Sequence, residues 1–113
     1  MQNISWAAPI LPGKLDAWRW FTDEIHARID EHAESRRGMG LHREVASLMS
    51  TPAGDFVCLY HEADDLAKAF HVLATSDSPY LQWFRQNLIE LHGLTPEMLQ
   101  GPPPAELKMD WQG

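Results

Sequence analysis

The chain has 113 residues, with 16 acidic and 9 basic side chains and a formal net charge of −7 at pH 7. This length suits a single domain, since domains commonly contain about 100 to 150 residues. The acidic balance, without a clustered basic stripe, argues against nucleic acid and anionic membranes as partners, because like charges repel. We therefore predict a protein that binds no nucleic acid and no membrane.

The cysteine count and the hydropathy pattern indicate a compartment. Cys58 is the single cysteine, lies in an apolar run and cannot form an intramolecular disulfide, which is typical of a reducing environment. No apolar run approaches the roughly 20 residues that a membrane-spanning helix needs, and no basic region followed by an apolar core opens the chain. These features predict a cytoplasmic protein.

The first elements are a strand and a long helix. Residues 4–10 alternate with a period of two, which predicts a strand, and Pro9 places that strand near a sheet edge because proline donates no hydrogen bond. From Lys14 onward the spacing changes to three and four, which predicts an amphipathic helix ending near Ser35, with Gly38 and Gly40 as stop signals. Its expected buried stripe is Leu15, Trp18, Phe21, Ile25 and Ile29.

A β-hairpin is predicted over Leu41 to Glu62, where two apolar runs flank the turn-forming residues 50–55. If Met49 faces Phe56, the antiparallel register places two sets of side chains on opposite faces. One face then carries Ser47 with Cys58, Val45 with Tyr60 and Arg43 with Glu62, and the other carries Leu48 with Val57, Ala46 with Leu59 and Glu44 with His61.

Two further helices and a C-terminal strand are predicted downstream. Asp64 or Asp65 can cap a helix that ends near Ser76, and a second helix begins at Ser78-Pro79 and stops at Gly93. Residues 95–113 comprise a Pro-rich connector and an alternating segment, 106–111, that predicts a fourth strand; a disordered tail is the alternative.

This order, βαββαβ, predicts an α+β, ferredoxin-like fold in a single domain spanning residues 1–113. Its four-stranded antiparallel sheet would carry helices on one face. The other face would expose Val45, Met49, Phe56, Cys58 and Tyr60, which are too apolar for water. A second copy packing sheet against sheet would cover them, so we predict a homodimer.

Several segments resemble an uncharacterised family of small bacterial proteins, identified as a member of the dimeric α/β-barrel superfamily. They are Pro9 to Lys14, Arg43-Glu44, Thr51 to Phe56, Glu62 to Asp65, Trp83-Phe84, Leu91 to Leu94 and the tail ending in Asp110-Trp111. The resemblance implies a homodimer whose two sheets enclose a barrel. That superfamily includes cofactor-independent monooxygenases, haem-degrading enzymes, isomerases and stress-induced proteins, so the resemblance implies no single reaction.

The pair expected to carry chemistry is His61 with Glu44, side by side across the hairpin. A carboxylate beside an imidazole favours the charged ring and orients it, which prepares a general base. A cross-strand ion pair that only ends the sheet uses the same residues, and this structural interpretation is the commoner one.

The remaining ionisable groups at the open end of the hairpin are candidate ligand-binding residues: His42, Arg43, Tyr60 and Glu62. Arg43 could bind a ligand carboxylate as a bidentate fork, and Tyr60 could donate to a carbonyl. A strand-end salt bridge and a packed tyrosine are the structural alternatives. The six histidines show no metal-ligand motif, so we predict no metal and no cofactor.

Two functional hypotheses follow. The first is a protein that binds a small apolar, aromatic or polyketide-like ligand, as a monooxygenase or isomerase without a cofactor, and it rests on superfamily analogy. The second is a non-enzymatic structural or stress-related homodimer. An enzyme needs a cavity that the ionisable groups face, whereas the structural hypothesis predicts a filled core.

Overall fold

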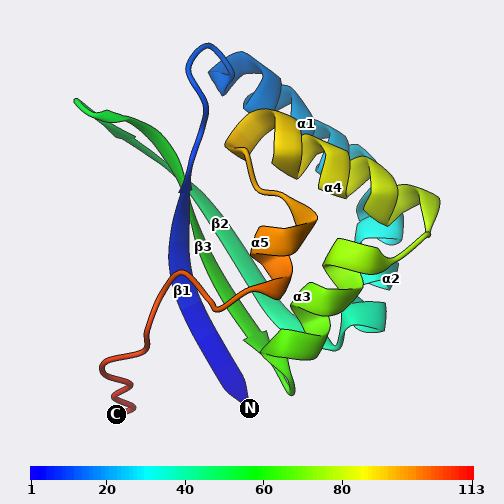
Figure 1. Ribbon diagram of the computed structural model, residues 1–113, viewed down its shortest axis with the longest axis vertical. Coiled ribbons are helices and arrows are strands. Elements are labelled where there is room, and N and C mark those ends of the chain that lie inside the picture. Colours follow the sequence, from blue (N-terminus) through cyan, green and yellow to red (C-terminus); the bar gives the residue numbers. More distant parts are fainter.

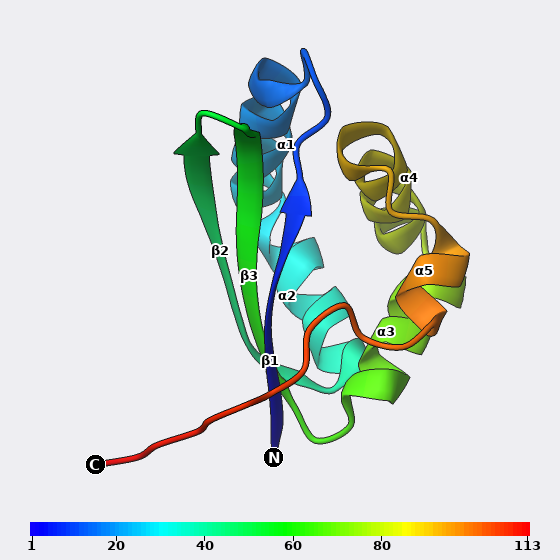
Figure 2. The ribbon, with the colours of Figure 1, turned by 60° about the vertical axis from the view of Figure 1, so that its left-hand side comes forward.

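The computed structural model describes residues 1–113 and places five helices on one face of a three-stranded antiparallel sheet (Figures 1 and 2). The elements follow in the order β1 (Gln2–Pro9), α1 (Leu15–Ala27), α2 (Ile29–Met39), β2 (Leu41–Thr51), β3 (Gly54–Ala63), α3 (Leu66–Thr75), α4 (Pro79–His92) and α5 (Pro96–Gln100). The strand order is β1-β3-β2, so the fold is α+β with β3 in the centre. None of its helices has both the length and the apolar character that crossing a membrane requires.

The predicted hairpin register is confirmed: Met49 lies opposite Phe56, and Glu44 lies opposite His61. The turn contains Pro52 and Ala53, and the Thr51 hydroxyl braces it by donating to the Gly54 carbonyl at 2.8 Å. Because side chains alternate along a strand, one face of the sheet points to the helices and the other stays open. The helix-facing positions of β2 and β3 are Glu44, Ala46, Leu48, Val57, Leu59 and His61.

The predicted four-stranded, ferredoxin-like sheet is wrong, and so is the dimeric α/β barrel that rested on it, because residues 106–111 form no strand. Three consecutive prolines, 102–104, follow α5 and carry no N–H groups for a sheet ladder. Beyond them the tail crosses β1 and leaves the domain (Figure 2). Its one side-chain tie to the body is the Asn3 amide, which donates to the Asp110 carboxylate at 3.0 Å. The alternating pattern of residues 106–111 therefore gave a wrong prediction of a strand, because no neighbouring strand fixes its register.

The predicted long helix is two helices. Arg28, with φ −112° and ψ 35°, ends α1 and begins α2 in a new direction. Its guanidinium donates twice to Glu31 and stacks over the rings of Tyr80 and Trp83. As a result Ile29, predicted to be buried, is 50% exposed, and a different face of α2 reaches the sheet.

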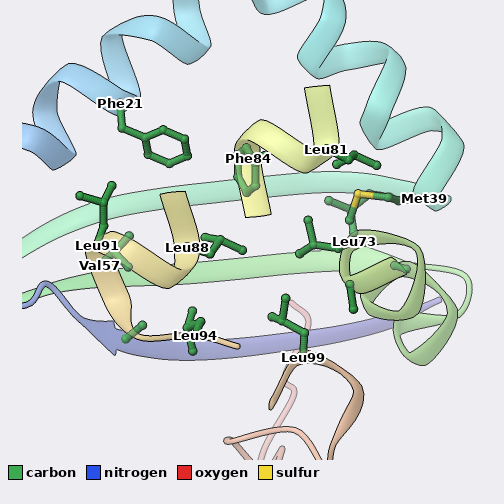
Figure 3. Close-up of a cluster of buried hydrophobic side chains, with 14 of the residues drawn as sticks. Phe21, Met39, Val57, Leu73, Leu81, Phe84, Leu88, Leu91, Leu94 and Leu99 are labelled. Carbon is green, nitrogen blue, oxygen red and sulfur yellow. The ribbon is translucent and has the colours of Figure 1, made fainter. Parts of the chain in front are cut away.

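The core lies between the sheet and the helices and draws side chains from almost every element (Figure 3). Phe21 of α1 and Phe84 of α4 meet with ring centroids 5.2 Å apart above Val57 of β3. The helices that cover this core begin as predicted: Asp65 accepts from the Lys68 N–H, and Ser78 accepts from the Leu81 N–H. These caps each contribute about 1 kcal/mol and fix the ends of the helices over the sheet.

Candidate functional site

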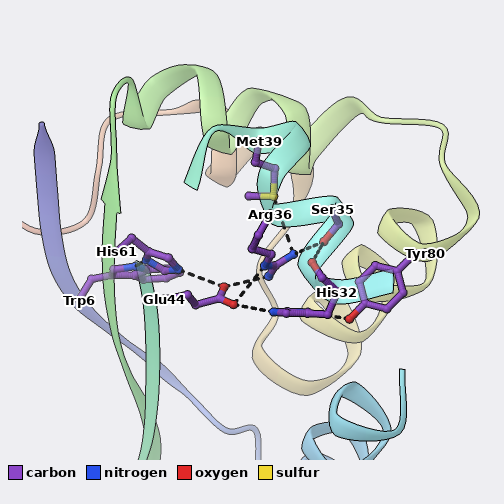
Figure 4. A network of polar contacts seen from close by, with 8 residues as sticks. All are labelled: Trp6, His32, Ser35, Arg36, Met39, Glu44, His61 and Tyr80. Atoms are coloured by element: carbon purple, nitrogen blue, oxygen red, sulfur yellow. Dashed lines mark hydrogen bonds and ion pairs between the residues drawn. The ribbon is translucent and has the colours of Figure 1, made fainter. Parts of the chain in front are cut away.

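The polar centre of the molecule is the carboxylate of Glu44, on the helix-facing side of β2 (Figure 4). Arg36 of α2 binds it as a fork, with Nε donating to Oε1 at 3.0 Å and Nη2 donating to Oε2 at 2.9 Å. His32, one turn earlier on α2, contacts Oε1 through Nε2 at 2.7 Å, and His61 Nε2 lies 3.5 Å from Oε2. Each of the two carboxylate oxygens of Glu44 therefore contacts two side-chain donors.

The electrostatics of Glu44 follow from these contacts. Burial alone would raise the pKa of Glu44, but the hydrogen bonds from His32 and His61 and the charge of Arg36 outweigh burial. The net result is a pKa of Glu44 far below its ordinary value, so the group is a carboxylate across the physiological range. The negative charge of Glu44 is thus balanced by the positive charge of Arg36.

His61 is held as the neutral ring by Trp6 of β1. The indole Nε1–H donates to His61 Nδ1 at 3.1 Å, and an indole can only donate. Nδ1 must therefore keep its lone pair, which places the hydrogen of His61 on Nε2, facing Glu44. The ring is 6% exposed and packs edge-on against Phe70 at 5.5 Å between centroids. The lone pair that a general base needs is thus already used by Trp6.

His32 differs from His61 because its second partner is a hydroxyl. Nδ1 lies 2.7 Å from the Tyr80 hydroxyl, which can donate to a neutral ring or accept from a charged one. Burial raises the pKa of Tyr80 to about 12, although the charges of Arg36 and Arg28 oppose this, so Tyr80 keeps its proton. The contact with Tyr80 therefore does not fix a single tautomer of His32.

Sequence reasoning missed His32, Arg36 and Tyr80. The signal was present, because His32, Arg36 and Met39 follow one another at spacings of four and three and share one face of α2. The assumption of one continuous helix centred on Ile25 and Ile29 concealed that stripe. Arg36 also donates through Nη1 to the Ser35 hydroxyl at 3.1 Å, so the fork is held rigidly against the sheet.

A cavity of about 600 Å³ lies beside this network, between α1, α4 and the helix-facing side of the sheet. Most of its walls are apolar, with Trp18 and Phe21 from α1, Phe84 and Leu88 from α4, and Ala46 from β2. His32, Arg36 and Glu44 also line it. The hydrogen-bonded network around Glu44 thus borders a mostly apolar cavity, whose volume lies in the range typical of small-molecule sites, about 300–1,000 Å³.

Comparison with known proteins identifies a family but no function. Residues 1–105 match the family described as "Family of unknown function (DUF6176)". The chain belongs to this family. No curated protein and no solved structure matches the chain, so no match links this DUF6176 chain to the dimeric α/β-barrel superfamily.

The six predicted site residues of the DUF6176 chain do not form one site. Glu44 and His61 meet on the helix side of the sheet, as their predicted pairing requires, and Glu44 alone of the six lines the cavity. Their assignment as catalytic residues stays a prediction.

The other four predicted residues lie elsewhere. On the open face the Tyr60 hydroxyl donates to Glu62 at 2.6 Å, which raises the pKa of Tyr60, and the Arg43 guanidinium lies 5.9 Å from the Tyr60 ring centroid. His42 sits at an irregularity in β2 and contacts Asp64 at 3.0 Å in solvent. Their assignment as ligand-binding residues also stays a prediction.

Metal-binding residue types do not converge in this chain. No group of three or more His, Cys, Asp or Glu side chains is placed to hold a metal ion. Around Glu44, where two histidines come closest to such a set, the guanidinium of Arg36 takes both carboxylate oxygens. The arrangement is therefore suited to holding polar groups in fixed positions beside the cavity.

Proposed function

We propose that this protein binds a small, largely apolar molecule with an aromatic or similarly flat body in the cavity beside Glu44. The observation that supports this is the meeting of aromatic walls with a rigid polar end. Trp18, Phe21 and Phe84 offer faces and edges for a ring, whereas His32, Arg36 and Glu44 set the orientation of the ligand.

The polar end favours a ligand that accepts a hydrogen bond. The guanidinium of Arg36 has five N–H groups, and four of them have partners in Glu44, Ser35 and the Met39 sulfur. The remaining N–H on Nη2 is the donor that a carbonyl or phenolic oxygen of the ligand would meet. Quinones and aromatic ketones have this chemistry.

The test is a thermal-shift and native mass spectrometry screen with quinones, aromatic acids, flavins and haem, followed by calorimetric titration of each hit. Ala46→Phe should abolish binding, because Ala46 is an exposed cavity-lining position on the edge strand and its new ring would occupy the chamber. Ser47→Phe is the matched control, since it adds the same ring one residue away on the open face. A hit that binds both variants equally would contradict this location.

Catalysis by His61 with Glu44, as a cofactor-independent oxidation or isomerisation, is the further part of this proposal, and it requires that Trp6 release Nδ1 of His61 so that this nitrogen can accept a proton. His61→Gln tests it, because a glutamine can accept from Trp6 and donate to Glu44 while it cannot exchange a proton. Turnover that survives unchanged in His61→Gln would remove His61 from the chemistry and leave binding as the function.

The second candidate is a non-enzymatic homodimer that forms through the open face of the sheet. Val45 and Met49 on this face are 37% and 43% exposed, and the tail, which carries the exposed residues Leu107, Met109 and Trp111, is tied to Asn3 of β1 through Asp110. Light scattering at micromolar concentration tests it, with Met49→Lys as the disrupting variant. A wild-type mass of 12.9 kDa would exclude the dimer.

A further inference from the structure

A second and larger cavity, of about 990 Å³, lies on the other side of Leu94, along the free edge of β1. Its walls come from β1, from α3, from α5 and from the Pro-rich segment 101–107 that passes from α5 across β1 (Figure 1). None of the residues predicted from the sequence as a site lines it. We refer to it as the edge groove.

The walls of the edge groove are apolar where they meet the body of the protein. Ile4 and Trp6 of β1, Leu66 and Phe70 of α3 and Leu99 of α5 provide that surface. Trp6 and Phe70 meet edge to face, with ring centroids 6.2 Å apart, and His61 holds the Trp6 indole in place through its Nδ1. Trp6 and Phe70 therefore form an aromatic surface of fixed orientation within the edge groove.

The charged residues that line the edge groove are both acidic. Glu97 on α5 and Glu106 on the Pro-rich segment are its ionisable lining groups, and no lysine, arginine or histidine lines it. Lys108 contacts Glu106 at 3.2 Å and offsets its charge, so Glu97, which has no ion-pair partner, is the acidic group that sets the charge of the groove. With a net charge of −7 on the whole chain, an anionic ligand would enter against the field.

The segment that closes the edge groove is stiff. Prolines 102–104 fix their own φ angles and donate no hydrogen bonds, so this wall cannot fold inward to fill the space as a flexible loop could. On one side α5 anchors it, with Thr95 capping the helix through the Met98 N–H, and on the other side Asp110 accepts from Asn3. The groove is thereby held open between two fixed ends.

From these features we propose that the edge groove binds an elongated apolar molecule whose polar end is cationic, such as an alkylammonium ion, and rejects the corresponding carboxylate. The apolar body would lie on Trp6 and Phe70, and the polar end would lie near Glu97. This site is separate from the cavity beside Glu44 and does not depend on the function proposed for it.

The experiment compares three probes that share one alkyl chain: decylammonium, decanol and decanoate, each titrated calorimetrically into the full chain below its micelle concentration. Decylammonium should bind tightest and decanoate weaker by about tenfold, because Glu97 attracts the cation and repels the anion. Equal binding of decanoate and decylammonium, or no binding of any probe, would overturn the proposal.

Two variants locate the site. Ala67→Trp places a ring into the edge groove from α3 and should abolish decylammonium binding, whereas Lys68→Trp, the next residue and not a lining one, should retain it. Glu97→Lys should reverse the order of the charged probes while decanol binding stays unchanged. Decylammonium binding that persists in Ala67→Trp, or an unchanged probe order in Glu97→Lys, would refute the location. Ala46→Phe should leave all three titrations unchanged, which separates this site from the first cavity.

Discussion

Replacing Glu44 with glutamine tests whether the polar centre holds the sheet to the helices. The substitution keeps the size of the side chain and one acceptor oxygen but removes the charge. Arg36, whose side chain is 9% exposed, would lose its counter-charge. If the amide nitrogen of the glutamine took the place of Oε1, its N–H groups would face the N–H donors of His32 and Arg36.

The magnitude follows from the burial of the pair. Removing one member of a buried ion pair costs about 3–5 kcal/mol, whereas a surface pair contributes about 0–1 kcal/mol. The Glu44 side chain is 21% exposed, so water reaches it in part, and we expect a loss near the lower end, about 3 kcal/mol. For a urea m-value of about 2 kcal/mol/M, the unfolding midpoint should fall by about 1.5 M.

Urea unfolding of the wild type, Glu44→Gln and Glu62→Gln measures this difference. Glu62 is the matched control, because it lies on the same hairpin but on the open face, where it accepts from Tyr60. Its substitution should cost less than about 1 kcal/mol. A loss below about 1 kcal/mol for Glu44→Gln, equal to that of the control, would refute the buried-pair reasoning.

The same variant predicts a pH effect. The pKa of Glu44 is lower in the folded than in the unfolded chain, so its contribution to stability is full above about pH 4.3, the ordinary glutamate value, and decreases as the pH falls further. The stability difference between wild type and Glu44→Gln should therefore shrink from pH 4 to pH 2. A difference that grows on acidification would contradict the assigned direction.

Three further predictions concern single contacts. Trp6→Phe removes the donor to His61 and should lower the unfolding free energy by about 1–2 kcal/mol, measured by far-UV circular dichroism during urea unfolding. Burial lowers the pKa of His92, whose Nδ1 donates to the Pro9 carbonyl, so stability should decline as the pH falls below about 6.5, the ordinary histidine value. His92→Asn retains a donor without titrating and should flatten that decline in a series of unfolding curves. Gly93, with φ 68°, ends α4, and Gly93→Ala should cost about 1 kcal/mol in the same assay, whereas an unchanged midpoint would show that the helix end is free to rearrange.

The hairpin was predictable because several independent signals agree on it. The turn formers of residues 50–55 fix where the chain reverses, and the period of two then determines every cross-strand pair. The contact between Glu44 and His61 follows from that register alone. The start of α4 at Ser78-Pro79 and its end at Gly93 were predictable for the same reason, since capping depends on neighbours in the sequence.

The parts that could not be predicted depend on long-range contacts. The network of His32, Arg36 and Tyr80 forms only because α2 turns away from α1 at Arg28, and that turn is stabilised by stacking on α4. The tail alternates like a strand, yet a single strand acquires its register from a paired strand, and no strand pairs with residues 106–111. Local patterns carry no information on either point.

The fixed hydrogen on His61 has a consequence for variation within the family. Because the Trp6 indole can only donate, a side chain at position 61 must accept toward β1 and donate toward Glu44 at the same time. Histidine and glutamine satisfy both demands, whereas a chain without an N–H at position 6 requires only the donation toward Glu44. Positions 6 and 61 should therefore covary, with loss of the indole accompanied at position 61 by side chains that donate without accepting.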